Sequence, residues 1–296
     1  MAKNGTYYVG RVLKLGELNQ DRLLSALSNP SILESKRGTW ALVDIKIGEA
    51  NKYIFGRLAR YLPEGKVDVV LPHTLSTGTQ IEPNLLVASA PFIYIPEHSG
   101  IAFLSNAPRI DQKTFSRIFC KIIENSLDGF FVDCDISLIA DLREFAIRIA
   151  SLDCIYKIKV TVSPPNPLFG PLWESLKDYL IARNADRLNL LEDARSGSSL
   201  NSILPDLASN IHVNSDYPQV SSDESVPLGD AAILMAVDGY GEGSIKGKSG
   251  QDTVIIRTSE TNVNFDFDRD PQANDLYEIA NRILEQIRAD RYMEHG

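Results

Sequence analysis

Cysteine and histidine are scarce in this chain, whose 296 residues include three cysteines and four histidines. The spacings between Cys120, Cys134 and Cys154 are 14 and 20 residues, which do not match the closely paired cysteines of a zinc site. An odd number of scattered cysteines is typical of reduced, mostly buried thiols, so we expect a cytoplasmic protein. The sequence also lacks an apolar run of about 18 residues, which argues against direct insertion into a membrane.

Motifs of catalysis are missing too. The chain contains no G-x-S-x-G, no H-E-x-x-H and no H-x-E paired with C-x-x-C. The glycine-rich segment 239–250 includes G-K-S, but a Walker loop needs glycine at the position where Glu242 stands. The stretch after it looks like a strand, whereas a phosphate-binding loop leads into a helix. We therefore predict a flexible hairpin loop, in which Lys246 and Lys248 can touch a phosphate backbone.

Two groups of acidic residues have spacings that suggest a metal site. Asp266, Asp268 and Asp270 match the start of a calcium loop, but its sixth and twelfth positions are proline and tyrosine here, instead of glycine and glutamate. We interpret them as a strand end that leads to a helix N-terminus, where acidic residues are favourable. Asp133 and Asp135 would need a third carboxylate that the sequence does not identify. We predict no metal, cofactor or catalytic residue, and a metal-dependent nuclease built on Asp133 and Asp135 is the third hypothesis.

Charge is distributed unevenly along the chain, whose formal net charge is -9. Residues 1–130 carry 15 Lys and Arg against 12 Asp and Glu, a net charge of +3. Residues 131–296 carry 15 against 27, a net charge of -12, so the acidic excess belongs to the second half. Such a chain does not suit non-specific coating of nucleic acid, which needs many cations near phosphates. One basic face on an acidic body is still compatible with the composition.

Hydrophobic periodicity predicts a mixture of strands and helices in the first half of the chain. The alternation in 39–47 indicates a strand with one apolar face, and 52–62 is its predicted hairpin partner, with a helix as the alternative. A second hairpin is predicted from 85–96 and 101–104 around a polar turn. Further strands are expected over 6–13 and 67–71, and helices over 19–27, 136–152 and a stretch that begins beside Asp111 as a helix cap.

The pattern restarts near residue 153. Strands are expected over 155–162, 187–191, 231–238, 253–258 and 263–267, helices over 171–182, 200–208 and 275–288, and an exposed loop over 214–229. Because strands and helices do not alternate strictly, we predict an α+β fold with mixed, mainly antiparallel sheets and flanking helices. The expected organisation is two lobes, an N-terminal lobe over 1–152 and an acidic C-terminal lobe over 153–296 that ends in a helix.

The most basic part of the sequence is the stretch 35–66, where seven cations stand against three carboxylates for a net charge of +4. Aromatic residues lie between these cations, and that combination suits phosphate contact together with base stacking. The alternative is an ordinary solvated sheet face. The predicted nucleic-acid-binding residues, with the two lysines of the glycine-rich segment, are Lys36, Arg37, Lys46, Lys52, Arg57, Arg60, Lys66, Lys246 and Lys248.

The order of segments resembles that of an uncharacterised bacterial domain family found among mobile elements and defence genes. The resemblance rests on T-W-A-L-V-D-I-K-I, P-N-L-L-V-A-S-A-P-F-I-Y-I-P-E-H with I-A-F-L, and I-K-V-T-V-S-P-P-N-P, in that order. The layout is also distantly similar to that of RexA, the lambda phage-exclusion protein. This resemblance implies a cytosolic phage-defence component, and similarity to RexA implies a two-lobed, DNA-binding homodimer without a catalytic site.

These observations lead to one principal hypothesis and a second from a different class. The principal hypothesis is a non-enzymatic defence protein that senses or binds nucleic acid, with DNA as the expected ligand, as a homodimer. The second is an adaptor that recognises a phage protein or a membrane effector through the acidic half and the loop 214–229. A cluster of cations on one surface favours the first hypothesis, whereas scattered, neutralised cations favour the second.

Overall fold

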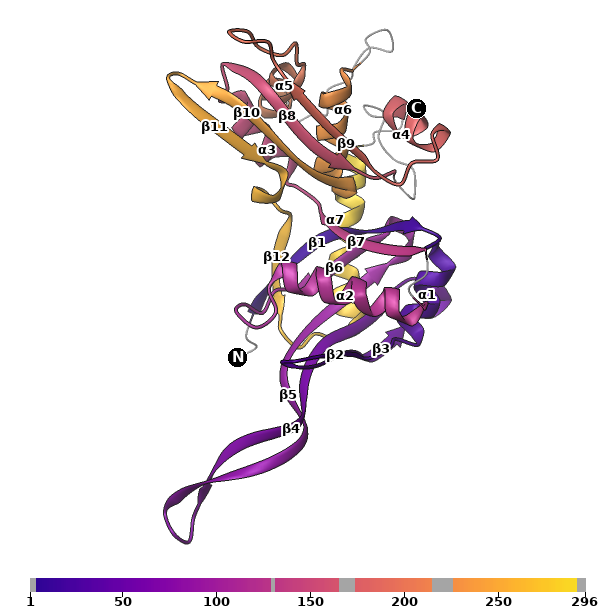
Figure 1. The fold of residues 1–296 in the computed structure, drawn as a ribbon, viewed down its shortest axis with the longest axis vertical. Coiled ribbons are helices and arrows are strands. Elements are labelled where there is room, and N and C mark those ends of the chain that lie inside the picture. The colour runs from indigo at the N-terminus through magenta and orange to yellow at the C-terminus, as the bar shows by residue number, and fades with distance from the viewer. Residues whose placement is uncertain (1–3, 129–130, 165–173, 215–225, 292–296) are drawn as a thin grey trace.

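The fold is built from two antiparallel sheets, seen one above the other in the computed structural model (Figure 1). Residues 4–128, 131–164, 174–214 and 226–291 are described. The large sheet contains β1 (Asn4–Gly16), β2 (Leu33–Ser35), β3 (Gly38–Ile47), β4 (Ile54–Leu71), β5 (Ser76–Ile95), β6 (Gly100–Leu104), β7 (Val132–Leu138) and β12 (Asn264–Asp268). The small sheet contains β8 (Cys154–Val162), β9 (Leu188–Asp193), β10 (Gly241–Ser249) and β11 (Asp252–Arg257). Every pairing between these strands is antiparallel, and the predicted α+β class is confirmed.

Helices cover both faces of the large sheet. The α-helices in the described part of the chain are α1 (Gln20–Ser28), α2 (Gln112–Ser126), α3 (Leu142–Ala150), α4 (Glu174–Ala182), α5 (Leu204–Asn214), α6 (Leu228–Met235) and α7 (Ala273–Arg291). On one face, Phe115 of α2 stacks on Phe103 of β6, with ring centroids 4.0 Å apart. On the other face, Leu284 of α7 lies against Gly100 of β6. The predicted hairpin of β5 and β6 is confirmed, and so is the cap of α2, because Asp111 accepts a hydrogen bond from the Thr114 amide at 2.7 Å.

The small sheet is covered on one face and open on the other. Along β8, the side chains of Ile158, Val160 and Val162 are buried with α3, α5 and α6 in a second hydrophobic core. The alternate residue Lys159 is exposed, as the period of a strand requires. Figure 1 shows these helices behind the four strands, whose open face is turned to the viewer. This open face bears the polar side chains of the small sheet.

The last segment of the chain returns from the small sheet to the large one. After β11, the chain adds β12 beside β1, with Asn4 opposite Asp268. Helix α7 then packs its buried residues Leu276, Ala280 and Leu284 into the core of the large sheet. Residues from both ends of the sequence therefore share one core, and the two sheets are connected by more than one crossing of the chain.

Three segments differ from the sequence-based predictions. Residues 231–238 were predicted as a buried strand but form α6 and a π-helical turn (Ala236–Tyr240), because an apolar run buried on every side has no diagnostic period. The predicted helix 136–152 begins as strand β7, and α3 starts only after Asp141, whose side chain caps it. The predicted loop 239–250 is instead β10, a central strand of the small sheet.

Glycines have a packing role in β10. An added Cβ at Gly247 would lie 2.4 Å from the Cys154 carbonyl oxygen, and one at Gly243 would lie 2.7 Å from Ile233 of α6. The glycine-rich composition that suggested a loop therefore allows close approach of neighbouring backbone and helix. Most of the predicted loop 214–229 lies outside the described residues.

A buried ion-pair cluster joins the two sheets. Arg11 of β1 donates to the backbone oxygens of Asp238 at 2.8 Å and His98 at 2.7 Å, and its guanidinium lies 4.9 Å from the Tyr240 ring centroid. Arg291, at the end of α7, pairs with the Asp238 carboxylate and donates to the Ala140 oxygen at 2.6 Å. All three charged side chains are at most 3% exposed. Buried charges of this kind are stable only when they remain together.

We expect Asp238→Asn to lower the free energy of unfolding by about 3–5 kcal/mol, because it leaves two buried guanidinium groups without that negative charge. Urea denaturation followed by circular dichroism measures this change. The matched control is Asp193→Asn, which breaks an exposed ion pair with Lys157 and should cost at most about 1 kcal/mol. Equal losses in the two variants would contradict a supporting role for the buried cluster.

The first turn of α6 contains a second buried carboxylate, Asp230. It accepts hydrogen bonds from the Ile203 amide at 2.7 Å and the Ser202 hydroxyl at 3.0 Å, yet burial raises its pKa from 3.8 to about 6. The folded state therefore holds the proton more tightly than the unfolded state, and stability from this group falls as pH rises from about 4 to 6. We expect the unfolding free energy of the native protein relative to Asp230→Asn to fall by about 3 kcal/mol over this window. Denaturation at pH 4 and pH 7 tests this, and parallel pH profiles would contradict it.

Candidate nucleic-acid interface

The structure does not bring the nine sequence-predicted cations onto one surface. Lys36 and Arg37 lie in the turn between β2 and β3, whereas Lys46 lies near the far end of β3, about 26 Å away along the strand. Lys52 follows a short 3-10 turn before β4, and Lys66 lies on the distal part of β4. Their role in binding stays a prediction, but they do not form the single basic face that motivated it.

The two arginines of β4 point to opposite faces of the large sheet, since they are three residues apart in a regular strand. Arg57 is neutralised by two carboxylates, Asp44 at 3.4 Å and Asp270, which precedes α7. Arg60 donates to the Arg37 backbone oxygen and lies 5.8 Å from the Trp40 ring centroid. Both side chains therefore have partners within the fold.

Lys246 and Lys248 lie on β10 of the small sheet, which Figure 1 shows far from the projecting ends of β4 and β5. Lys246 is opposite Lys157 of β8, and its ammonium lies 5.5 Å from the Tyr156 ring centroid. Its neighbour two residues earlier, Ser244, is opposite Lys159. Lys246 therefore shares the open face of the small sheet with Lys157 and Lys159, which the predicted set did not include.

Two adjoining cavities form a groove where the open face of the small sheet meets β7 and α2. One cavity has a volume of about 390 Å³ and the other about 690 Å³, and they share Asp135, Ile136, Gly241, Glu242 and Ser259 in their walls. The lining residues place the groove between the small sheet and the large sheet. We call this feature the basic groove, because Lys and Arg outnumber Asp and Glu in its walls.

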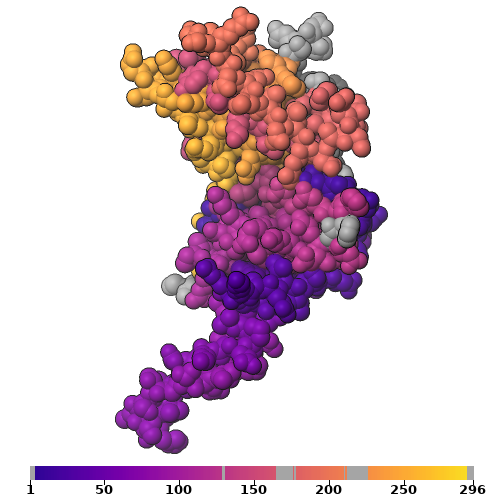
Figure 2. All heavy atoms as spheres, in the orientation of Figure 1, coloured from indigo at the N-terminus to yellow at the C-terminus, as the bar shows by residue number. Residues whose placement is uncertain are grey.

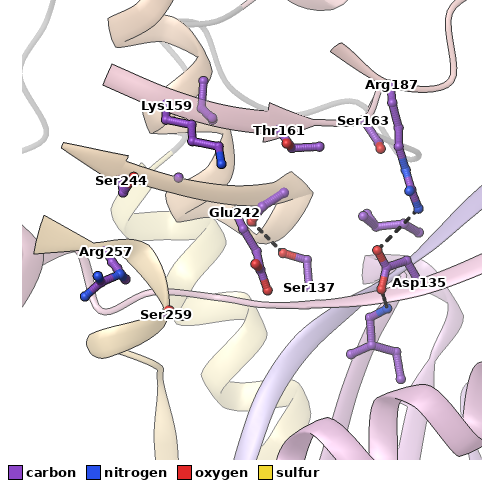
Figure 3. A pocket seen from close by; sticks show the side chains of 15 residues that line it. Asp135, Ser137, Lys159, Thr161, Ser163, Arg187, Glu242, Ser244, Arg257 and Ser259 are labelled. Atoms are coloured by element: carbon purple, nitrogen blue, oxygen red, sulfur yellow. Dashed lines mark hydrogen bonds and ion pairs between the residues drawn. The ribbon is translucent and has the colours of Figure 1, made fainter. Parts of the chain in front are cut away.

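Six cations line the basic groove against three carboxylates, a local net charge of +3 on a chain whose net charge is -9. The cations are Lys113, Arg117, Lys121, Lys159, Arg187 and Arg257, and the carboxylates are Glu124, Asp135 and Glu242. Figure 3 shows Lys159 on β8, Arg257 and Arg187 at the two sides, and Glu242 and Asp135 between them. The fold, and not the order of residues in the sequence, therefore brings these positive charges together.

Helix α2 contributes a row of three cations to the groove. Lys113, Arg117 and Lys121 are spaced by four residues, which places them on one face of the helix over about 12 Å of its axis. The opposite face of α2 is buried in the core of the large sheet. All three side chains are exposed, and no ion pair joins them to a carboxylate in the described part of the chain. They are available to an external anion.

The small sheet and its flanking loops supply the other half of the groove. Lys159 is exposed and, among the residues described, has no carboxylate within ion-pair distance. Arg257 pairs with Glu260 at 2.7 Å, and Arg187 lies 3.4 Å from both Asp133 and Asp135. The hydroxyl groups in the walls, all potential hydrogen-bond donors to phosphate, are those of Ser116, Ser137, Thr161, Ser163, Ser244, Thr258 and Ser259.

The carboxylates of the groove do not assemble a metal centre. Across the described residues, no group of three histidine, cysteine or acidic side chains has the geometry to hold a metal ion. Asp133 and Asp135 are instead both close to Arg187, as Figure 3 shows for Asp135. Glu124 accepts a hydrogen bond from the Cys134 amide at 3.1 Å, and burial raises its pKa. Nothing in this arrangement supports the nuclease hypothesis.

Part of the groove could have been found from the sequence. The spacing of Lys113, Arg117 and Lys121 on the polar side of a predicted helix is a visible signal, and so is the alternation that exposes Lys157 and Lys159. What the sequence does not contain is the placement of α2 beside the small sheet. That placement depends on contacts between residues more than a hundred positions apart, such as the hydrogen bond from Ser137 to the Gly241 oxygen at 2.8 Å.

The sequence of residues 39–224 matches the family described as "Domain of unknown function (DUF4747)". The match covers more than half of the chain, so the protein belongs to this family. It includes β3 to β9, and with them α2, Lys159 and Arg187, but not Arg257. No curated protein matches the sequence.

Among the described residues, no helix is both long and apolar enough to cross a bilayer.

Proposed function

We propose that the protein binds a nucleic acid strand in the basic groove. The observation that carries this proposal is the row of Lys113, Arg117 and Lys121 in one cavity and Lys159 in the adjoining cavity, with no carboxylate within ion-pair distance of any of the four in the described structure. Exposed cations that repel one another are usually separated or neutralised on an acidic protein, so their concentration in one groove favours an anionic ligand.

The dimensions of the groove favour a chain of phosphates over a single one. The α2 row alone extends over about 12 Å, whereas neighbouring phosphates of a DNA strand are spaced by about 3.4 Å along the helix axis. The hydroxyl side chains in the walls suit the many weak contacts that position a sugar–phosphate backbone. On the same sheet face, Tyr156 and Lys246 supply an aromatic ring and a further cation beyond the cavity.

DNA is the ligand we infer, and binding rather than catalysis is the activity. The groove contains cations and hydroxyl groups but, among the residues described, no cluster of ligands for the metal that nucleases use. The adaptor hypothesis is weaker at this site, because the walls are basic while the second half of the chain is acidic overall. The distant resemblance in segment order to defence proteins motivates a role in the response to phage.

We expect the triple variant Lys113→Gln, Arg117→Gln, Lys121→Gln to lose at least about tenfold in affinity for DNA and to reduce the slope of log K against log salt by about 2–3. Fluorescence anisotropy with a labelled 20-nucleotide strand and with its duplex, each measured at several salt concentrations, gives both quantities. The matched control is Lys36→Gln, Lys46→Gln, Lys52→Gln, which removes the same charge from exposed sites outside the groove.

The two triple variants separate the groove from the basic stretch of the sequence. A large loss in the control with little loss in the α2 variant would move the binding site to residues 35–66. If the native protein forms no salt-dependent complex with DNA at micromolar concentration, the proposal is overturned.

The role in phage defence has its own test. We expect bacteria that express the protein to reduce the efficiency of plating of a sensitive phage, and the α2 triple variant to lose most of that protection, because sensing requires the groove. A panel of phages compared on cells with the native gene, the α2 variant and an empty vector provides the measurement. Full protection by the α2 variant would show that defence does not depend on this site.

A further inference from the structure

A two-stranded arm projects from the large sheet. Strand β3 stops pairing with β4 at Tyr61, and β6 pairs with β5 only from Phe92 onward. Between these points β4 and β5 pair only with each other, out to Leu71 and Ser76. We define the arm as residues 63–85, and Figures 1 and 2 show it extending well away from the body.

The arm buries almost nothing within its own chain. None of its seven valine, leucine and isoleucine residues belongs to either hydrophobic core. Leu75 is 88% exposed, Val70 69% and Ile81 60%. A two-stranded ribbon with no third strand and no helix against it is marginally stable in water, and its free edges are templates for pairing with another strand. The arm therefore favours a partner that supplies a strand.

The charge of the arm argues against nucleic acid as that partner. Three carboxylates, Glu64, Asp68 and Glu82, accompany a single cation, Lys66. A ribbon that follows phosphates needs an excess of cations. The partner is therefore a protein, and the order of residues on β4 indicates which one.

The free edge of β4 is complementary to itself. In an antiparallel pair of two identical strands related by a two-fold axis at Val67, Lys66 of each copy lies directly opposite Asp68 of the other. Val67 meets its own copy, and Glu64 lies opposite Val70. No proline interrupts β4 between Glu64 and Leu71, whereas β5 contains Pro83, which lacks the amide that a ladder requires. An axis at Gly65 would instead bring Pro63 into the ladder.

We propose that a second copy of this chain binds the arm, through antiparallel pairing of the two β4 edges about Val67. The two arms then form one four-stranded ribbon, stabilised by backbone hydrogen bonds and by two symmetric Lys66–Asp68 pairs. The proline-free ladder from Glu64 to Val70 involves about seven residues per copy, fewer than the 20–30 residues a side of a standard stable interface. The dimer is therefore concentration-dependent, with dissociation in the micromolar range.

Charge exchange tests this register with the full-length protein, freed of nucleic acid so that DNA cannot bridge two copies. Sedimentation velocity from 1 to 200 µM should show dimerisation of the native chain. Lys66→Asp places carboxylates opposite each other and Asp68→Lys places ammonium groups opposite each other, so each single variant should dissociate at least about tenfold more readily. The double variant should restore the dimer, because the pairs are reversed and not removed.

Mixing the two single variants gives the most specific test of the register. In a dimer of Lys66→Asp with Asp68→Lys, both cross-strand pairs are attractive again, so native mass spectrometry should show a heterodimer in preference to either homodimer. The control Glu64→Lys makes a comparable charge change on the same strand, but its side chain faces Val70 of the second copy and should leave dimerisation within about twofold.

The proposal is overturned if the native protein stays monomeric at 200 µM, or if the single variants dimerise as well as the native chain. It is also overturned if the mixture of single variants contains no preferred heterodimer. All of these substitutions lie outside the basic groove, so DNA affinity measured on the same samples reports separately on the function of that site.

Discussion

The buried cluster of Arg11, Asp238 and Arg291 holds the two sheets in one arrangement. It takes one arginine from the first strand, one from the last helix and the carboxylate from the π-helical turn just before β10. Removing any of these charges from water is costly, so they stay buried only while the three elements remain packed together. Because Gly241 and Glu242 follow this turn directly and line both cavities, the cluster also sets the position of the groove.

A basic groove on an acidic protein is electrostatically compatible with the proposed binding of an anion. The net charge of -9 repels nucleic acid at long range, but salt screens that repulsion over about 8–10 Å, and a local excess of cations then dominates in the groove. Lys159 of β8 and the three cations of α2 line adjoining cavities, which share wall residues from β7 and β10.

The arm and the groove belong to opposite parts of the molecule and have opposite chemistry. The groove is concave, basic and built from side chains of both sheets, whereas the arm is extended, mildly acidic and separate from both cores. An arm-mediated dimer would therefore leave two grooves accessible. Two grooves on one particle can engage one long nucleic acid at two points, which raises the apparent affinity without any change in the groove itself.

Local sequence alone determined much of the secondary structure of this protein. Alternation indicated β3 and β8, turn residues indicated the β5–β6 hairpin, and Asp111 marked the start of α2, because each of these signals acts within a few residues. Residues 231–238 and 239–250 were assigned wrongly for the opposite reason: their states depend on burial on all sides and on close backbone contacts. Only the tertiary structure brought the cavity that Lys113 lines beside the cavity that Lys159 lines, because charge in a sequence has a sign and a position but no direction in space.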